Sequence, residues 1–338
     1  MRVSYRLPGF LVAALTLACM LQGCQREQTE APPSGPVNTA TSQAPANDAK
    51  SIEIQHKLGS TVAPANPQRV VAYDMSVLDS LDQLGISIAG MPKDYVPNYL
   101  TTYKRDAAIA DVGSVLQPNL EKLHATKPDL ILISPLVAWS YEDLSKIAPT
   151  IYFDIDFMNA HGGFIKGAAE QLTTLGRVFG VEDRARDKID EINQKVAAAK
   201  TVTKGRPERA LIVMYNNGSF TAFGVQSRYG FIYDTLGVTP ASTHIEPGMH
   251  GQPISNEFIV EADPDILYVI DRTAAVERHA ANPADLNNPL IRQTKAWKNG
   301  RVVMADPDVW YLSGAGAGSV QTLIDQVLQG YEANPKRP

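Results

Sequence analysis

The sequence predicts an α/β protein in which two lobes with mostly parallel sheets are joined by one long helix. Short apolar runs alternate with helical patterns in both halves of the chain, as expected for strands and helices arranged around parallel sheets. A long amphipathic pattern separates the halves, and a helix, turn and strand motif occurs once in each of them. These observations place a first lobe at 51–180, a connecting helix at 181–204 and a second lobe at 205–338.

Residues 1–23 have the order of features expected for an export signal. Two arginines precede an apolar stretch at 10–21, and Gly23 stands directly before Cys24. The stretch is shorter than the roughly 20 apolar residues that a membrane-spanning helix requires. The Leu-Gln-Gly-Cys ending resembles a lipobox, so we expect Cys24 to be lipidated after cleavage. Cleavage by the ordinary signal peptidase is the alternative.

Residues 24–50 are predicted to be a flexible linker between this lipid anchor and the folded lobes. The segment is rich in Gln, Glu, Thr, Ala, Pro, Ser and Asn, and Val37 is its only branched aliphatic residue. Such a composition buries too little apolar surface to order the chain. A coil of this length reaches on the order of 30 Å.

Composition excludes some classes of protein. The formal net charge is −5 with both signs interspersed, so the sequence has no basic stripe of the kind that nucleic-acid binding requires. Of the two cysteines, Cys19 leaves with the signal and Cys24 carries the lipid, so the folded part is expected to contain no disulfide. About 290 residues follow the linker, enough to bury a substantial core.

The predicted strands are short apolar runs. They lie at 69–73, 86–90, 130–133 and 151–153 in the first lobe, and at 210–214, 266–270 and 302–304 in the second.

The connecting helix is predicted from spacing. Its apolar residues recur at intervals of four and three, and acidic residues stand at its start, where the helix dipole favours them; the apolar positions are Ala185, Ile189, Ile192, Val196 and Ala199. About 20 residues at 1.5 Å each give roughly 30 Å, the width of a small domain. The helix can therefore run from one lobe to the other.

The two halves also contain a repeat. Residues 119–133 align with 256–270, and Glu121 and Glu257 each stand seven residues before a Pro-Asp pair that leads into a strand. This matched spacing favours a pseudo-twofold pair of units over chance similarity.

Several motifs occur in a fixed order from Pro67 to Ile324: Ile147-Ala-Pro-Thr150, Ser227-Arg-Tyr-Gly230, Asp234-Thr-Leu-Gly237, His250-Gly251, Ser255-Asn-Glu-Phe258, Asp271-Arg272 and Trp310-Tyr-Leu-Ser-Gly314. Together they resemble the periplasmic binding proteins for iron siderophores, haem and cobalamin, and most of all the catecholate-siderophore binding proteins. The resemblance implies two Rossmann-like lobes joined by a single rigid helix, the class III arrangement.

The resemblance also implies ligand-binding residues. Arg228 and Arg272 occupy positions of binding arginines, whose planar guanidinium groups suit the anionic oxygens of a ferric catecholate. His250 and Tyr311 occupy positions that bind Fe(III) directly when a tetradentate siderophore leaves coordination sites open. Without the resemblance, His250 would be an ordinary surface or core histidine and Tyr311 a core aromatic with a hydrogen-bonded hydroxyl.

The chain departs from that family in the first lobe. Where close relatives have an arginine after a strand, in a Ser-Gly-Arg pattern, this chain has Ser134-Pro-Leu-Val-Ala-Trp139. Lys93 or Arg105 could supply the missing charge, and Trp139 could offer an aromatic wall to a catechol ring. We expect a less basic cleft and a less highly charged or mixed-donor ligand.

Glu121 and Glu257 are implied to dock into arginine pockets of the ABC permease dimer in the inner membrane. The alternative is that they only stabilise the first turns of helices capped by Asn119 and by Ser255 or Asn256. Both can hold at once.

The expected function is that of a monomeric, lipid-anchored binding component of an ABC importer on the periplasmic face of the cell membrane. Ferric siderophore is its transported ligand, and no cofactor is permanently bound. Haem or cobalamin binding is the first alternative. An extracytoplasmic metal-dependent enzyme using His244, His250, Asp265 and Asp271 is the second, without a recognisable catalytic motif. Gln25, which follows the lipidated cysteine, leaves inner or outer membrane anchoring open.

Overall fold

The computed structural model describes residues 51–158, 163–278 and 288–332. The predicted export signal at 1–23 and the linker at 24–50, with Cys24, lie outside the described residues. Among the residues that are described, no helix has both the length and the apolar character needed to cross a membrane.

The described chain opens with an antiparallel hairpin that the sequence analysis did not predict. Strand β1 (Ser51–His56) pairs with β2 (Gly59–Pro64), and both lie against β7 (Thr150–Tyr152) at the edge of the first-lobe sheet. The Thr61 hydroxyl donates to the Thr150 carbonyl oxygen at 2.6 Å. The hairpin therefore covers the outer strand of the first lobe.

The first-lobe sheet is entirely parallel. Its strands follow the order β5-β4-β3-β6-β7, with β3 at Val70–Ala72, β4 at Gly90–Met91, β5 at Ala110–Asp111 and β6 at Leu130–Ile133. The order in which strands are added reverses between β3 and β6. In open α/β sheets such a switch point, beyond the carboxyl ends of the strands, is where ligands bind.

Helices and short 3₁₀ turns connect these strands. They are α1 (Met75–Gln83), η1 (Asn98–Leu100), α2 (Thr101–Arg105), α3 (Leu120–Thr126), η2 (Pro135–Ser140), α4 (Tyr141–Ser145) and α5 (Gly163–Phe179).

The second-lobe sheet is parallel at its centre and antiparallel at one edge. Its order is β11-β9-β8-β12-β13, with β8 at Arg209–Asn216, β9 at Ser219–Phe223, β11 at Gln252–Ile254, β12 at Ile266–Asp271 and β13 at Val302–Ala305; the short β10 (Thr239–Pro240) also pairs with β8. Strand β9 turns back on β8 through Asn217 and Gly218, both at positive φ, which is typical of two-residue hairpin loops. The switch point of this lobe lies between β8 and β12.

The second-lobe helices and turns are α7 (Gly230–Asp234), α8 (Asn256–Ala262), α9 (Arg272–Glu277), η3 (Ile291–Gln293), α11 (Lys295–Lys298), the π-helical turn η4 (Asp308–Leu312) and α12 (Ala317–Gln329).

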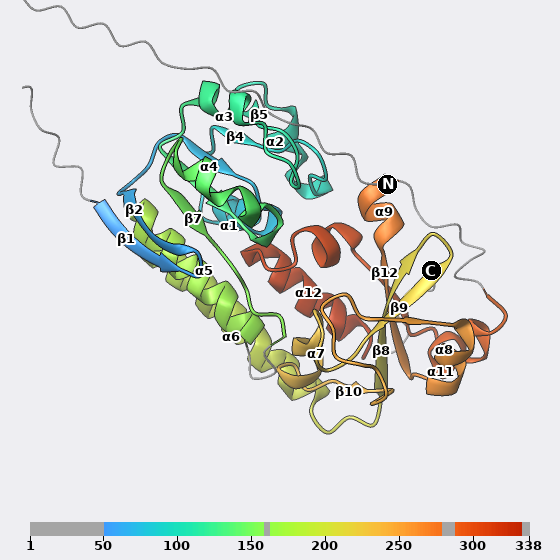
Figure 1. Cartoon of the computed structure of the whole chain (residues 1–338). Helices are drawn as coiled ribbons and strands as arrows, with labels where there is room; N and C mark the ends of the chain where they lie inside the picture. Colours follow the sequence, from blue (N-terminus) through green and yellow to red (C-terminus); the bar gives the residue numbers. More distant parts are fainter. Residues whose placement is uncertain (1–50, 159–162, 279–287, 333–338) are drawn as a thin grey trace, which may run out of the picture. The chain divides into compact units, whose positions relative to one another are not determined.

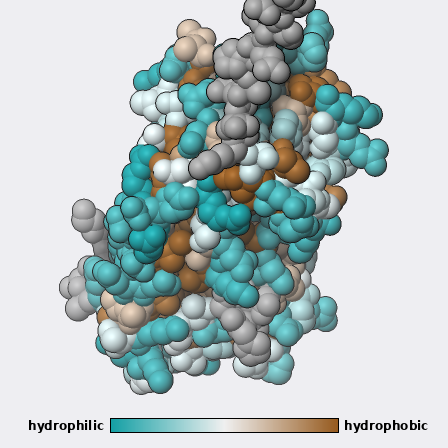
Figure 2. All heavy atoms as spheres, turned by 90° about the vertical axis from the view of Figure 1, so that its left-hand side faces the viewer, coloured by the Kyte–Doolittle hydropathy of each residue, from teal (hydrophilic) through white to brown (hydrophobic). Residues whose placement is uncertain are grey.

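A single long helix, α6 (Glu182–Thr203), connects the lobes along one side of the molecule (Figure 1). Its predicted apolar positions are buried, except Ile189, which is partly buried, and it packs against α5 and α12. Hydrophilic residues cover most of the outer face on that side, with hydrophobic side chains exposed only in small areas (Figure 2). The predicted fold class is thus confirmed, whereas the exact domain boundaries stay predictions.

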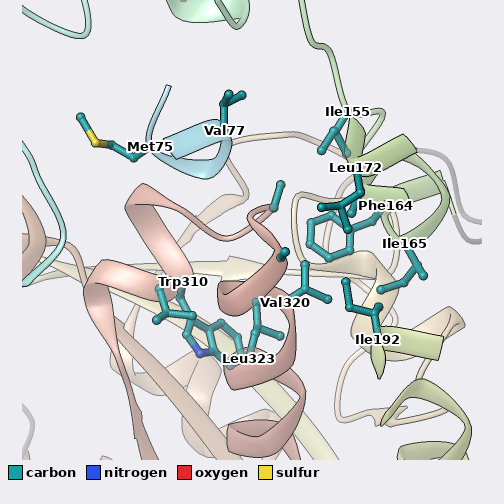
Figure 3. Packing of buried hydrophobic residues seen from close by; sticks show 14 of the residues in the cluster. Met75, Val77, Ile155, Phe164, Ile165, Leu172, Ile192, Trp310, Val320 and Leu323 are labelled. Atoms are coloured by element: carbon teal, nitrogen blue, oxygen red, sulfur yellow. The ribbon is translucent and has the colours of Figure 1, made fainter. Parts of the chain in front are cut away.

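One hydrophobic cluster runs through both lobes. Figure 3 shows Val320 and Leu323 of α12 near Trp310, with side chains of α5 and α6 in the same cluster. Between α5 and α7, the rings of Phe164 and Phe231 stack with centroids 4.0 Å apart. Because the cluster is continuous, the lobes are fixed to each other by packing as well as by α6.

A buried carboxylate joins the lobes beside this cluster. Asp79 of α1 is fully buried and accepts hydrogen bonds from the backbone nitrogens of Gly318 at 3.0 Å and Ser319 at 2.9 Å, in the first turn of α12. Gly316 at the start of α12 supplies no cap of its own, and a Cβ there would lie 2.1 Å from Asp79 Oδ2. Asp79 therefore caps the second-lobe helix from the first lobe.

We predict that Asp79 makes stability depend on pH. Burial raises the pKa of Asp79 from its ordinary value of 3.8 to about 6, so the folded protein binds this proton more tightly than the unfolded chain. Below about pH 4 this tighter proton binding raises the free energy of unfolding by on the order of 3 kcal/mol. This stabilisation is lost as pH rises through about 6.

The D79N variant cannot titrate at this position. The difference in Tm between the two proteins, D79N minus wild type, should therefore increase from about pH 4 to pH 7. Thermal unfolding followed by circular dichroism measures it. D187N, at an exposed position of α6, is the control and should show a constant difference. A constant difference for D79N as well would contradict the prediction.

Candidate ligand-binding cleft

A cleft of about 440 Å³ lies between the lobes, where both switch points open. Tyr73 follows β3, Ser134 follows β6 and Arg272 follows β12, and all three line it. The volume is in the range of small-molecule sites. The cleft therefore lies where open α/β sheets bind ligands.

Arg228, between β9 and α7, brings one positive charge to the cleft. It is half-buried, and its Nη2 donates to the backbone oxygen of Tyr311 at 2.6 Å. Its guanidinium carbon lies 5.4 Å from the ring centroid of Tyr311 and 5.9 Å from that of Phe157. Ring contacts at this distance hold the guanidinium group in place.

Arg272, the first residue of α9, brings the second charge to the same point. Its Nε donates to the Tyr311 hydroxyl at 2.8 Å, and its Nη1 donates to Asn216 Oδ1 at 3.0 Å. A guanidinium group has five N–H donors, so both arginines keep donors for an anionic ligand. The structure thus brings Arg228 and Arg272, the two arginines expected to bind ligand, together at Tyr311.

Tyr311 is positioned by the π-helical turn η4. The preceding Trp310 is fully buried, and its Nε1 donates to Gln326 Oε1 at 2.7 Å, while the Tyr229 hydroxyl donates to the Trp310 carbonyl oxygen at 3.0 Å. Turns of this kind are frequent at functional sites. The turn directs two neighbouring aromatics into different places, Trp310 into the core and Tyr311 into the cleft.

His250 also lines the cleft, from the exposed loop before β11. The next residue, Gly251, has φ +70°, and a Cβ there would lie 2.6 Å from the carbonyl oxygen of Ala222 in β9. The loop can approach β9 this closely only with glycine at that position. His250 and Tyr311 therefore line the same cleft from separate elements.

Trp139 and Lys93 are not among the residues that line this cleft, and neither is Arg105. Trp139 is 68% exposed on η2, and Lys93 Nζ donates to the carbonyl oxygen of Asp106 at 2.8 Å. The described lining therefore contains neither the charge expected from Lys93 or Arg105 nor the aromatic wall expected from Trp139. Within the described lining, the first lobe contributes no lysine or arginine.

The first lobe instead provides an apolar and aromatic wall that the sequence analysis missed. Its members follow the carboxyl ends of first-lobe strands: Tyr95, Val115, Leu116, Pro135, Leu136, Phe153, Ile155 and Phe157. Their positions directly after parallel strands were the available signal. The cleft is therefore basic on the second-lobe side and mainly apolar on the first-lobe side, where Asp74 also lines it.

The structure does not bring the residues considered for a metal-dependent enzyme together in one site. Asp265 accepts from the Arg209 backbone nitrogen at 2.9 Å, and Asp271 caps α9 by accepting from Ala274 N at 2.9 Å. In the described part of the chain, no group of three or more His, Cys, Asp and Glu side chains could hold a metal ion.

The predicted repeat has a physical basis in both lobes. Asp129 and Asp265, of the two Pro-Asp pairs, accept from the backbone nitrogens of Arg69 and Arg209, each at 2.9 Å. The side chain of each arginine in turn donates to carbonyl oxygens at the end of α3 or α8. The two short helices are therefore held in the same way.

Glu121 and Glu257 occupy matching places in these helices. Both are exposed in the first turn, and α3 and α8 are capped by Asn119 and Ser255. A hydrogen bond with the Ser255 side chain lowers the pKa of Glu257.

The chain matches the family described as periplasmic binding proteins over residues 70–309. It is 52% identical over 283 residues to the ferric-anguibactin-binding protein FatB of Vibrio anguillarum, covering 83% of this chain and 88% of that protein. It is 36% identical over 328 residues to the petrobactin-binding protein YclQ of Bacillus subtilis, covering 96% of this chain and 98% of that protein.

A solved structure of the siderophore-binding protein BauB, bound to a complex between two molecules of acinetobactin and ferric iron, has a TM-score of 0.79 and 51% identity. The match covers 85% of this chain and all of that one. These relatives are binding proteins rather than enzymes. On the family match, the two-lobed fold and these relatives, the chain belongs to the periplasmic binding protein family.

Proposed function

We propose that this protein is the exported binding component of an ABC importer and captures a ferric siderophore in the cleft between its lobes. The observation that carries the proposal is that Arg228 and Arg272 both donate hydrogen bonds to Tyr311 and keep further N–H donors free for a ligand. They lie opposite the apolar first-lobe wall of the same cleft. The named ligands of FatB, YclQ and BauB are ferric siderophores or siderophores, which favours this class over haem and cobalamin.

The charge of the cleft limits the ligand. Ferric catecholates and related complexes present anionic oxygens that guanidinium groups bind well. Two arginines, without a third from the first lobe, favour a complex with less negative charge than a tris-catecholate. We therefore propose a ligand with catecholate or mixed donors and low net charge.

Binding can be followed by tryptophan fluorescence, since Trp310 precedes the proposed ligand Tyr311. Ferric acinetobactin should quench the signal saturably, and R228Q or R272Q should each weaken binding about ten- to a hundredfold, as expected for a lost charged hydrogen bond. R186Q, at an exposed position of α6, should bind like the wild type.

Two results would contradict the proposal. One is the absence of saturable quenching by ferric acinetobactin, ferric anguibactin and ferric petrobactin. The other is saturable binding of haemin or cobalamin alone, which would select the alternative ligand class.

We further propose that His250 and Tyr311 complete the coordination of Fe(III) when a siderophore leaves sites open. Imidazole nitrogen and phenolate oxygen are suitable iron ligands, and the hydrogen bond from Arg272 Nε holds the Tyr311 hydroxyl in the cleft. The H250A/Y311F double variant should weaken binding of a tetradentate ferric complex at least tenfold and that of a hexadentate complex much less. Equal losses in the two titrations would mean that the residues only shape the cleft.

We propose that Glu121 and Glu257 present the protein to the two subunits of the permease. Their exposure on matching helices of the two lobes supports this, because a two-fold partner requires two equivalent contacts. E121K/E257K should reduce siderophore-dependent iron uptake by cells at least tenfold while leaving siderophore affinity unchanged. E170K, on α5, is the control, and full uptake by the double variant would exclude this docking role.

We propose that Cys24 carries the lipid and that the protein acts, as a monomer, on the periplasmic face of the cell membrane. The linker at 24–50 would then keep the lobes within reach of the importer.

A further inference from the structure

Ser134 has a buried hydroxyl without a partner. The residue stands directly after β6 at the first-lobe switch point, is 6% exposed and lines the cleft. Its Oγ has no hydrogen-bond partner in the described part of the chain. Of the buried side-chain atoms there that lack a partner, Ser134 Oγ alone belongs to a residue that lines the cleft. A buried hydroxyl left unpaired is unfavourable, so a ligand group that accepts from it would gain affinity.

The matching residue of the second lobe has a structural role that Ser134 lacks. Ser134 is the N-cap position of η2, which follows β6, and Asp271 is the N-cap position of α9, which follows β12. Asp271 caps α9, whereas the Ser134 side chain makes no such hydrogen bond at the start of η2. The same place in the fold therefore presents a cation in one lobe, and a neutral donor followed by proline in the other.

The first-lobe side of the cleft also exposes apolar side chains to solvent. Leu136 is 51% exposed and Leu116 is 56% exposed, and both line the cleft on the first-lobe side. Anionic oxygens placed against these leucines would lose their hydration without gaining a charged partner. An apolar part of a ligand would instead remove them from water.

We infer that the cleft selects an asymmetric ferric complex, with anionic oxygens facing Arg228 and Arg272 and an apolar face towards the first lobe. That apolar face carries one neutral hydrogen-bond acceptor, and the Ser134 hydroxyl donates to it. Ser134 is thus a specificity-determining residue. The inference rests on the proposed function, because it concerns the ligand of the same cleft.

The test uses two probes and two substitutions. The probes are ferric acinetobactin and a ferric tripodal tris-catecholate, which is a symmetric trianion. S134A should weaken the binding of ferric acinetobactin about three- to tenfold, as expected for one lost neutral hydrogen bond. It should leave the binding of the tris-catecholate, which is weaker in the wild type, unchanged. S134R, which adds a cation to the first-lobe wall, should strengthen tris-catecholate binding at least tenfold.

Thermal unfolding without ligand separates a binding role from a structural one. Since the hydroxyl has no partner in the protein, S134A should have a Tm equal to or above that of the wild type. S140A removes a hydroxyl from the other end of η2, outside the cleft, and should not change binding of either probe.

The outcomes distinguish the two proposals. If the wild type binds none of the ferric siderophores, the proposed function fails, and the inference with it. If the wild type binds ferric acinetobactin but S134A binds equally tightly or has a lower Tm, the inference is overturned while the function stands. Tighter wild-type binding of the tris-catecholate than of ferric acinetobactin would also overturn it.

Discussion

The hydrogen bonds from α12 to the buried carboxylate of Asp79 are the contact on which the geometry of the cleft depends. The elements on either side of this contact both reach the cleft, since the start of α1 supplies Met75 and Ser76, and the segment before α12 supplies Tyr311 and Ala315. With the continuous core behind it, Asp79 fixes one wall relative to the other. The protein side chains that line the cleft are therefore held in place before a ligand binds, which lowers the entropic cost of binding.

The two walls are related in backbone and different in chemistry. Both follow parallel strands, in lobes where a short helix is held by an arginine and a Pro-Asp pair. In the second lobe the switch point presents Arg272, whereas in the first it presents Ser134 and apolar side chains. The two lobes thus share a backbone arrangement but present different side chains to the cleft.

Much of this fold could be predicted from sequence, because it depends on local periodicity. The spacing of buried residues predicted α6, and continuous apolar runs predicted strands such as β6 and β12. The hairpin of β8 and β9 was missed although Asn217-Gly218 is a strong hairpin signal. The positions of Trp139 and Lys93 outside the described lining could not be predicted, because the local course of η2 and of the chain after β4 decides which side chains enter the cleft. The role of Asp79 depends on packing between lobes, which periodicity does not contain.

The most direct measurement is anomalous X-ray diffraction at the iron absorption edge from crystals grown with ferric acinetobactin. The proposed function predicts one iron peak in the cleft, with ligand oxygens within hydrogen-bond distance of the Arg228 and Arg272 guanidinium groups. An iron peak elsewhere on a protein whose cleft is empty would contradict capture between the lobes.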